Sequence, residues 1–492
     1  MQKTFGGHCA PLTKSLTATI LAAALLCAAP QGASTHDVPD ELGKGVRSLG
    51  HSATGFETKR IEGTGEGMPS VRGPFPDTVN MEFLGQVTNG DMGLDKLVFT
   101  GATFLSDIWG WEDPESGNEY AIFGTTSGVA FVRVTDPTNP EFLGIVPTTN
   151  TGTIRNFWWD MKTFGNYVYW TTEVNNSGVG IFDLQRLDGL PEVPAGSTLV
   201  EDARWGVNPA TGVGPDPVTG YIRAHNIAIN PTKPLAYLVG VSKVPAIAPG
   251  FSDDGMVILD ISNPLDPVEV ATISGPDIDS HDVQVVTYAG PDTEHQGKEV
   301  LVNFNGTELN VQVWDVSDLA NIALISTFDY RGAGFSHQGW FTPDHQFILL
   351  GDEEDELFGI SDPRNPDLPD TARTHICDAR DLDNVDCYGV FDSDAAAIDH
   401  NLFVKEDKVY QANYTSGIRV LQISDDGSGS GRIALSEIAH MDTEPRLPNK
   451  HMNHNINIFV GPWGVYPFFE SGTIAASDGL NGLVLMRLTG GS

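Results

Sequence analysis

Short apolar segments recur along this chain about every sixty residues. Each follows a turn that usually contains Gly, and each has the length of a β-strand. The seven copies lie at 127–137, 177–184, 254–262, 309–318, 373–382, 417–425 and 481–488. Many short apolar strands separated by regularly spaced turns predict an all-β protein.

A polar pair that opens a strand precedes each of these segments. The pairs are Ser106-Asp107, Trp159-Asp160, His225-Asn226, His281-Asp282, His337-Gln338, His400-Asn401 and His454-Asn455. Another strand follows, and a fourth closes most repeats, as at 141–146, 268–273, 322–328 and 433–439. Four strands per repeat and seven repeats predict a seven-bladed β-propeller.

The first and last segments predict how the ring closes. The last repeat has three strands, whereas MEFLGQV at 81–87 precedes the first repeat and resembles its fourth strand, EFLGIV at 141–146. Because a lone strand would leave an unpaired edge, we expect 81–87 to pair with 482–488 and complete the last blade. The propeller then spans 79–490. Two stacked sandwiches are the alternative, but they leave 81–87 unexplained.

Two long Pro- and Gly-rich segments interrupt the repeats. Residues 189–223 extend the end of the second unit, and 358–372 separate the second and third strands of the fifth. Both are expected to be surface loops.

The N-terminus resembles a secretion signal. Residues 1–33 combine Lys3 and Lys14 with an apolar run at 17–29, too short for a membrane span, and then small residues. We therefore predict a signal peptide, a flexible leader at 34–78 and a secreted protein without a membrane span. A lipoprotein anchored at Cys27 is disfavoured by the preceding Leu26.

Two cysteines remain after the signal peptide, Cys377 and Cys387. In an exported chain an even pair predicts a disulfide. A metal site with His375 is the weaker alternative, because no second cysteine pair accompanies these two.

The charge excludes some partners. The chain carries 28 Lys and Arg against 65 Asp and Glu, a net charge of -37. Such a surface repels nucleic acid and anionic lipid but attracts cations. We therefore expect a monomer that meets an extracellular ligand or protein and no nucleic acid.

Several motifs resemble one family. SHDVQVV, SHQGW, GDEEDE, DHNLFV and ANYTSGIRVL, in that order, resemble the LVIVD-repeat proteins of the choice-of-anchor B family, over roughly 100–488. The resemblance implies a secreted or surface-displayed propeller and no settled reaction. Family members differ in their C-terminal anchors, whereas this chain ends GLVLMRLTGGS, so we expect no anchor.

The polar pairs identify a candidate site. In a propeller the first strand of each blade lines the central channel, so the strand openings should surround one mouth, and the turn 352–356 should reach the same face. The predicted ligand-binding residues are Asp107, Asp160, Asn226, Gln338, Trp340, Asn401 and Asn455. The predicted metal ligands are His225, His281, Asp282, His337, Asp352, Glu353, Asp355, Glu356, His400 and His454.

The role of these residues stays open at this stage. Strand side chains alternate, so either the His set or the carboxylate and amide set should face the axis. Histidines favour a transition metal and oxygen donors a hard cation, and the acidity favours Ca²⁺ slightly. Alternatively, these side chains hydrogen-bond a neighbouring blade and fix its spacing. The acidic turn is either a solvated surface or a source of an acid and a base, Glu353 and Asp355.

Aromatic residues and the remaining histidines offer less specific evidence. Tryptophans near the strand openings (Trp109, Trp111, Trp158, Trp159 and Trp340) either stack on sugar rings or pack between sheets. His295, His345 and His440 fall outside the register and are expected at the surface. The chain lacks a nucleophile elbow, a phosphate loop and an HExxH motif. We favour a non-catalytic binding propeller; the alternative is a metal-dependent hydrolase or polysaccharide lyase.

Overall fold

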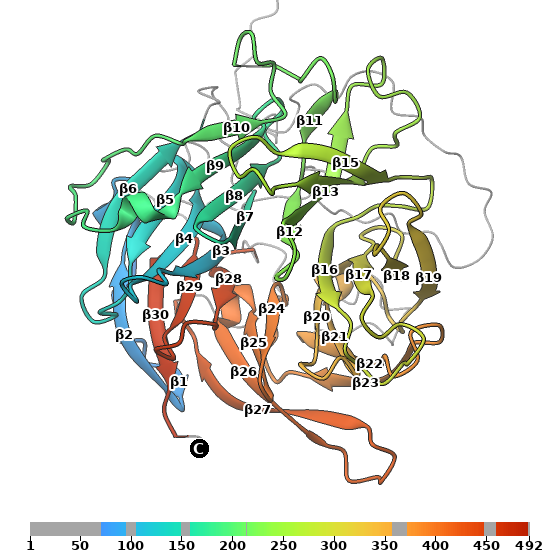
Figure 1. Ribbon diagram of the computed structural model, residues 1–492. Coiled ribbons are helices and arrows are strands. Elements are labelled where there is room, and N and C mark those ends of the chain that lie inside the picture. Colours follow the sequence, from blue (N-terminus) through green and yellow to red (C-terminus); the bar gives the residue numbers. More distant parts are fainter. Residues whose placement is uncertain are drawn as a thin grey trace, which may run out of the picture.

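A computed structural model describes residues 70–94, 105–148, 158–212, 214–356, 371–446 and 459–490. These residues form seven antiparallel sheets arranged in a ring, so the predicted seven-bladed β-propeller is confirmed (Figure 1). Helix in this part of the chain comprises α1 (Asn89–Met92), η2 (Leu184–Leu187), η3 (Tyr414–Ser416) and the two helical residues 355–356 that end one described range.

The first three blades contain strands β3 to β15, listed here from the innermost strand outward. Blade 1 is β3 (Leu105–Glu112), β4 (Glu119–Thr125), β5 (Gly128–Arg133) and β6 (Glu141–Pro147); blade 2 is β7 (Trp159–Phe164), β8 (Tyr167–Thr172), β9 (Val179–Asp183) and β10 (Ala203–Trp205); blade 3 is β12 (Asn226–Ile229), β13 (Leu235–Lys243), β14 (Gly255–Asp260) and β15 (Val268–Ile273). In blade 3 the short β11 (Tyr221–Arg223) also pairs with β13.

The other four blades contain the remaining strands. Blade 4 is β16 (Asp282–Thr287), β17 (Glu299–Phe304), β18 (Val311–Asp315) and β19 (Ala323–Phe328); blade 5 is β20 (Ser336–Phe341), β21 (Phe347–Asp352), β22 (Arg373–Asp378) and β23 (Asp386–Asp392); blade 6 is β24 (Leu402–Lys405), β25 (Lys408–Ala412), β26 (Ile418–Asp425), β27 (Ile433–Met441) and β1 (Thr78–Val79); blade 7 is β28 (Pro462–Tyr466), β29 (Ile474–Asp478), β30 (Gly482–Leu488) and β2 (Met81–Val87). All seven apolar segments of the sequence pattern are third strands.

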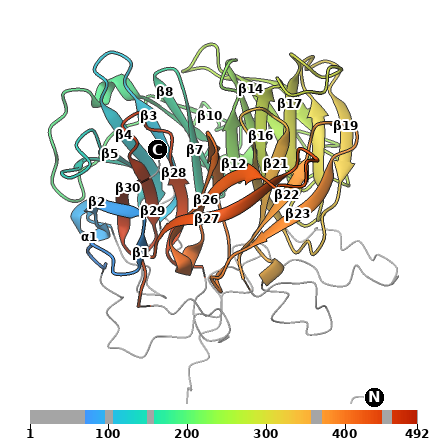
Figure 2. The same cartoon turned by 90° about the horizontal axis from the view of Figure 1, so that it is seen from below.

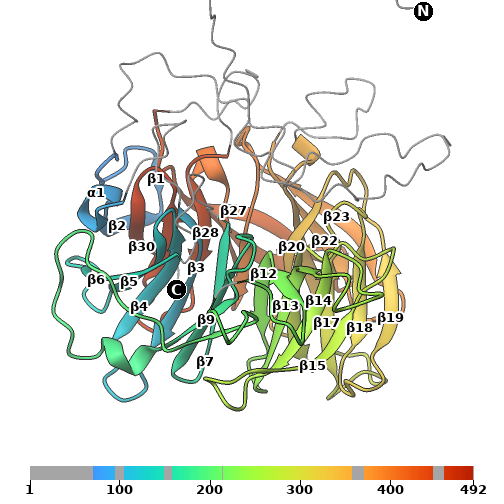
Figure 3. The same cartoon turned by 90° about the horizontal axis from the view of Figure 1, so that it is seen from above.

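The ring closes as the sequence predicts. Strand β2 pairs antiparallel with β30, from Met81 opposite Leu488 to Val87 opposite Leu483. The preceding β1 adds to the outer edge of blade 6. Blue β2 lies beside red β30 in three views (Figures 1, 2 and 3). The two ends of the propeller thus share one blade, which removes the open edge.

The blades pack through the side chains of their inner strands. Each innermost strand contacts the next, from β3 round to β28 and back to β3. Every residue of β4 and β17 is buried, whereas the outer β15 and β19 retain exposed residues. Because inner strands have a neighbour on both faces, they are near-continuously apolar in sequence. Each fully buried aliphatic side chain contributes about 1.5–3 kcal/mol.

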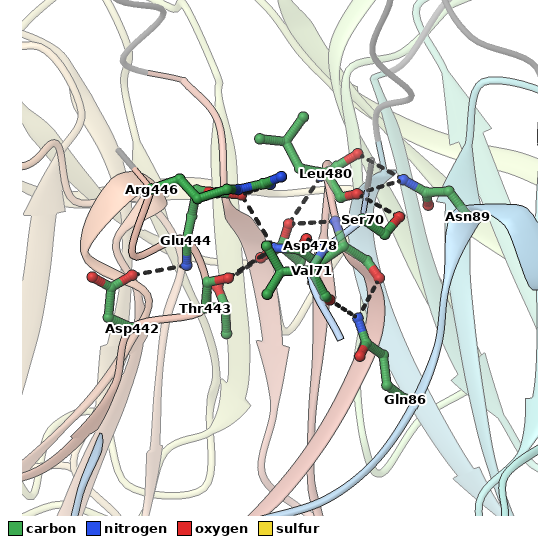
Figure 4. Close-up of polar contacts among 12 residues, drawn as sticks. Ser70, Val71, Gln86, Asn89, Asp442, Thr443, Glu444, Arg446, Asp478 and Leu480 are labelled. Atoms are coloured by element: carbon green, nitrogen blue, oxygen red, sulfur yellow. Dashed lines mark hydrogen bonds and ion pairs between the residues drawn. The ribbon is translucent and has the colours of Figure 1, made fainter. Parts of the chain in front are cut away.

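The segment before β1 is fixed to blade 7. The Val71 N–H donates to the Asn481 side chain, and the Ser70 hydroxyl donates to the Leu480 carbonyl. Gln86 in turn donates to the Val71 carbonyl (Figure 4). Residues 70–73 therefore dock onto the turn between β29 and β30.

Some expectations from the sequence need correction. The segment 189–223, expected to be loop, contains β10, the fourth strand of blade 2, and β11. In the described residues the innermost strand of blade 7 is β28, Pro462–Tyr466. His454 and Asn455 lie outside the described residues. The predicted disulfide between Cys377 and Cys387 is confirmed and joins paired residues of β22 and β23.

Candidate metal centre

The polar pairs lie at the channel because the first strands of several blades begin with a shift in pairing register. The pairing register shifts around His337 in β20, around Ser106 and Asp107 in β3 and around Trp463 in β28. A bulge of this kind redirects a side chain that strict alternation would turn away. His225 and His281 instead lie immediately before their strands begin, and His400 lies two residues before β24.

Members of both predicted residue sets line one cavity, contrary to the expectation that one set would face away, but Asp160, Asp282 and Gln338 are not among the lining residues. The cavity is lined by Asp107, Trp158, Trp159, His225, Asn226, His281, His337, His400, Asn401 and Trp463. The alternation rule fails here because bulges and non-strand residues do not follow the pleat. The volume of about 10 Å³ has room for a water molecule or a metal ion.

Four imidazoles from successive blades stand side by side around this cavity. Ring centroids are 4.3 Å apart for His225 and His281, 4.4 Å for His281 and His337, and 4.4 Å for His337 and His400. Trp463 continues the row, 4.8 Å from His400. All four histidines are buried.

Hydrogen bonds fix the tautomer of three of these histidines. Nδ1 of His281 lies 3.0 Å from the His337 carbonyl oxygen, and Nδ1 of His400 lies 2.5 Å from the Trp463 carbonyl oxygen. Since a carbonyl can only accept, Nδ1 carries a proton, and in the neutral imidazole Nε2 then holds the lone pair. Nδ1 of His225 similarly contacts Glu173 at 2.6 Å. Such contacts to the second nitrogen are typical of metal-binding histidines.

Asp352 organises the acidic turn that follows β21. Its carboxylate accepts hydrogen bonds from the backbone N–H groups of Gly334, Phe335, Glu354 and Asp355, and from the Tyr330 hydroxyl. With its oxygens so engaged, Asp352 shapes the turn. Its position presents the next residue, Glu353, to the histidines.

Glu353 meets two of the imidazoles that line the cavity, although it is not itself a lining residue. Its Oε2 lies 3.5 Å from Nε2 of His337, and its Oε1 lies 3.8 Å from Nε2 of His400. One ligand atom from each of the three residues lies within 4.8 Å of the other two. The Tyr414 hydroxyl donates to Glu353 at 2.6 Å and orients the carboxylate. Two imidazoles and one carboxylate are a donor set used for Zn²⁺ and Fe²⁺.

The charge state of Glu353 depends on its surroundings. Burial raises its pKa to about 8, and the Tyr414 hydrogen bond only partly opposes this effect. Glu353 is 3% exposed, so a cation beside it would replace the missing solvation.

A second polar cluster surrounds Lys162 on β7. Lys162 Nζ lies 2.6 Å from Asp160 Oδ1 and 4.8 Å from the centroid of the Trp109 ring. Burial lowers the pKa of Lys162, but the carboxylates of Asp160, Asp282 and Asp107 outweigh that effect and raise it overall. Burial raises the pKa of Asp282 to about 7. This cluster neutralises part of the channel's acidity internally.

Two of the predicted ligand-binding residues connect neighbouring blades. Asp160 Oδ2 accepts the Ile227 N–H at 2.9 Å, and Gln338 Oε1 accepts the Leu402 N–H at 2.9 Å. Asn401 donates to Asp107 across the channel. These contacts match the alternative in which such side chains set the blade spacing. The Nδ1 atoms of His281 and His400 also connect neighbouring blades, through the His337 and Trp463 carbonyl groups. Their Nε2 atoms remain available to the cavity.

Trp158 and Trp159 line the cavity, whereas Trp109, Trp340 and His295 contact other parts of the fold. Trp340 stacks edge-on against Phe403 at 5.1 Å, and Trp109 against Tyr466 at 5.2 Å. Both therefore pack between sheets. His295 was expected at the surface but is 4% exposed, with Nε2 3.1 Å from Asp383.

Four residues of this region were missed by the sequence analysis: Trp463, Tyr414, Lys162 and Asp399. Lys162 follows Asp160 by two residues, so strand alternation could have placed both on one face. Trp463 lies 63 residues after His400, a spacing that the chain also shows between His337 and His400.

Comparisons with known proteins give fold-level likeness. No family model and no curated protein matches the chain. Hydrazine synthase from Kuenenia stuttgartiensis is 15% identical, with a TM-score of 0.44, over 76% of this chain and 94% of that one. A putative 6-phosphogluconolactonase from Bacteroides fragilis is 12% identical, with a TM-score of 0.43, over 77% of this chain and 87% of that one. The Cps50 (Swd1) β-propeller domain of Myceliophteria thermophila is 11% identical, with a TM-score of 0.44, over 78% of this chain and 96% of that one.

Membership of the LVIVD-repeat family stays a prediction after these comparisons. The fold assignment rests on the strand pairing of this chain. None of the helices in the described residues has the length and apolar character that a membrane crossing needs.

Proposed function

We propose that this protein is an exported β-propeller that binds one divalent transition-metal ion at the mouth of its channel. His337, His400 and Glu353 are its ligands, with His281 and Tyr414 beside them. The observation that carries the proposal is the approach of two Nε2 atoms and one buried carboxylate from adjacent blades. The nitrogen donors favour Zn²⁺, Fe²⁺, Ni²⁺ or Cu²⁺ over the Ca²⁺ favoured from the sequence.

The size of the cavity favours binding over catalysis. A volume of about 10 Å³ admits an ion or a water molecule but no sugar ring or phosphoester. The ion would then cross-link blades 5 and 6. The hydrolase or lyase alternative requires a larger substrate space than this cavity provides.

Export forms part of the proposal. It is supported by the predicted signal peptide at 1–33 and by the Cys377–Cys387 disulfide, which suits an oxidising compartment. An extracellular ligand or protein on the same face remains the expected partner.

Metal content tests the site. The purified protein, exposed to Zn²⁺ or Co²⁺ and then desalted, should retain one equivalent, and so should His440→Ala, which removes an imidazole paired with Glu437. His400→Ala and Glu353→Gln should lose it. Retention of the ion by both variants, or no binding by the parent chain, would refute the proposal.

A further inference from the structure

Three carboxyl groups lie together beside the predicted metal ligands. Asp355 and Glu356 belong to the turn after β21, and Asp399 precedes His400. One oxygen of each lies within 4.8 Å of the other two. Exposure is 0% for Asp355 and Glu356 and 1% for Asp399. The cluster contains oxygen donors alone, unlike the imidazole site.

None of the six oxygens of this cluster accepts a hydrogen bond of normal geometry from the described residues, although the Arg373 backbone N–H lies near enough to Asp399 to oppose the rise in its pKa. The contrast with Asp352 is informative, because that buried carboxylate receives five donors in the same turn. The fold therefore supplies N–H and O–H groups to the carboxylate that shapes the turn and leaves these three aimed at one another.

Such an arrangement is costly without a cation. A buried carboxylate with no partner loses its hydration and gains nothing in return. Arg373 acts on Asp355 electrostatically, but its guanidinium pairs with Asp392 at 2.6 Å. The alternatives are protons shared among the three carboxyls or an ion held between them.

We propose that Asp355, Glu356 and Asp399 form a second site, for a hard divalent cation such as Ca²⁺ or Mn²⁺. Three carboxylates can supply up to six oxygen ligands, which suits these ions and not a nitrogen-seeking metal. The site is distinct from the imidazole site in every ligand. The two sites nevertheless draw their ligands from the same two chain segments, 353–356 and 399–400. A cation in one site therefore restricts the motion of the segments that hold the ligands of the other.

The test uses the full secreted chain in excess Zn²⁺, so that Ca²⁺ cannot report on the imidazole site. Isothermal titration calorimetry should show one Ca²⁺ bound to the parent chain and to Asp318→Asn, which changes an exposed turn acid. The volume-conserving double variant Asp355→Asn, Glu356→Gln should weaken Ca²⁺ binding by more than about tenfold, because it removes two ligand charges. Its zinc content should stay unchanged.

Infrared spectroscopy of the parent chain keeps the proposal testable if that variant misfolds. Protonated buried carboxyls give a carbonyl band, and the part of it that Asp355, Glu356 and Asp399 contribute should be lost when Ca²⁺ or Mn²⁺ binds. No titratable Ca²⁺ or Mn²⁺ site, a double variant that binds like the parent, or a carbonyl band whose intensity does not fall at saturating cation would overturn the proposal. Loss of zinc binding with Ca²⁺ binding retained would count against the imidazole site alone.

Discussion

A disulfide across the seam of the ring would test how the propeller closes. Glu82 on β2 and Arg487 on β30 are paired residues, about half exposed, with an ion pair of 2.8 Å. Both can be replaced by cysteine at little cost, because an exposed ion pair contributes about 0–1 kcal/mol. The two positions are 405 residues apart in sequence.

The size of the effect follows from that separation. In the loop-entropy description a cross-link spanning 405 residues stabilises the folded state by up to about 6 kcal/mol. A matched control joins Ser424 and Ala434, paired residues of β26 and β27 that are 10 residues apart. The same description gives about 3 kcal/mol for the control, so the seam cross-link should exceed it by about 3 kcal/mol.

Denaturant-induced unfolding of the two oxidised variants and the parent measures this difference. Peptide mapping must first show that the new disulfide has formed and that Cys377–Cys387 is intact. If the cysteines at 82 and 487 fail to join under oxidant, the two strands are not neighbours. Equal stabilisation by both cross-links would show that closure does not constrain the unfolded chain as argued.

Three further predictions concern single features of the fold. Reducing Cys377–Cys387 should lower the free energy of unfolding by about 3 kcal/mol, given its separation of 10 residues, as measured with and without reductant. Burial raises the pKa of Asp478 to about 6, so the folded state binds this proton more tightly than the unfolded state does. The free energy of unfolding of the parent, relative to that of Asp478→Asn, should therefore fall by up to about 3 kcal/mol as pH rises from about 4 to 7. Paired denaturant titrations of the two proteins across this pH range measure the difference. Gly240→Ala should cost at least about 1 kcal/mol in thermal unfolding, because φ is +59° and the new Cβ would lie 2.5 Å from Cβ of His225.

The sequence was sufficient for the architecture because each blade repeats one pattern. Strand period, turn positions and the orphan segment at 81–87 all depend on local chemistry and order along the chain. The strand β10 was missed because it has only three residues and lies inside a long Pro- and Gly-rich segment. Three residues are too few to show the alternation of apolar and polar positions that predicts a strand. Its pairing with β9 is visible only in three dimensions.

The candidate site was predictable in composition but not in detail. The repeated pairs identified His337 and His400, and the acidic turn identified Glu353. Bulges could not be foreseen, because they depend on pairing register and not on residue type, and they let members of both residue sets reach the cavity. Asp399 was missed because its partners, Asp355 and Glu356, come from the neighbouring blade.

Anomalous diffraction from crystals of the metal-loaded protein tests the central claim most directly. Data collected on either side of the absorption edge of the bound transition metal should show one peak at the channel mouth. We expect it about 2.0–2.2 Å from Nε2 of His337, Nε2 of His400 and a Glu353 oxygen. A mouth without a peak, with Glu353 still facing the two imidazoles as it does at 3.5 and 3.8 Å, would contradict the account.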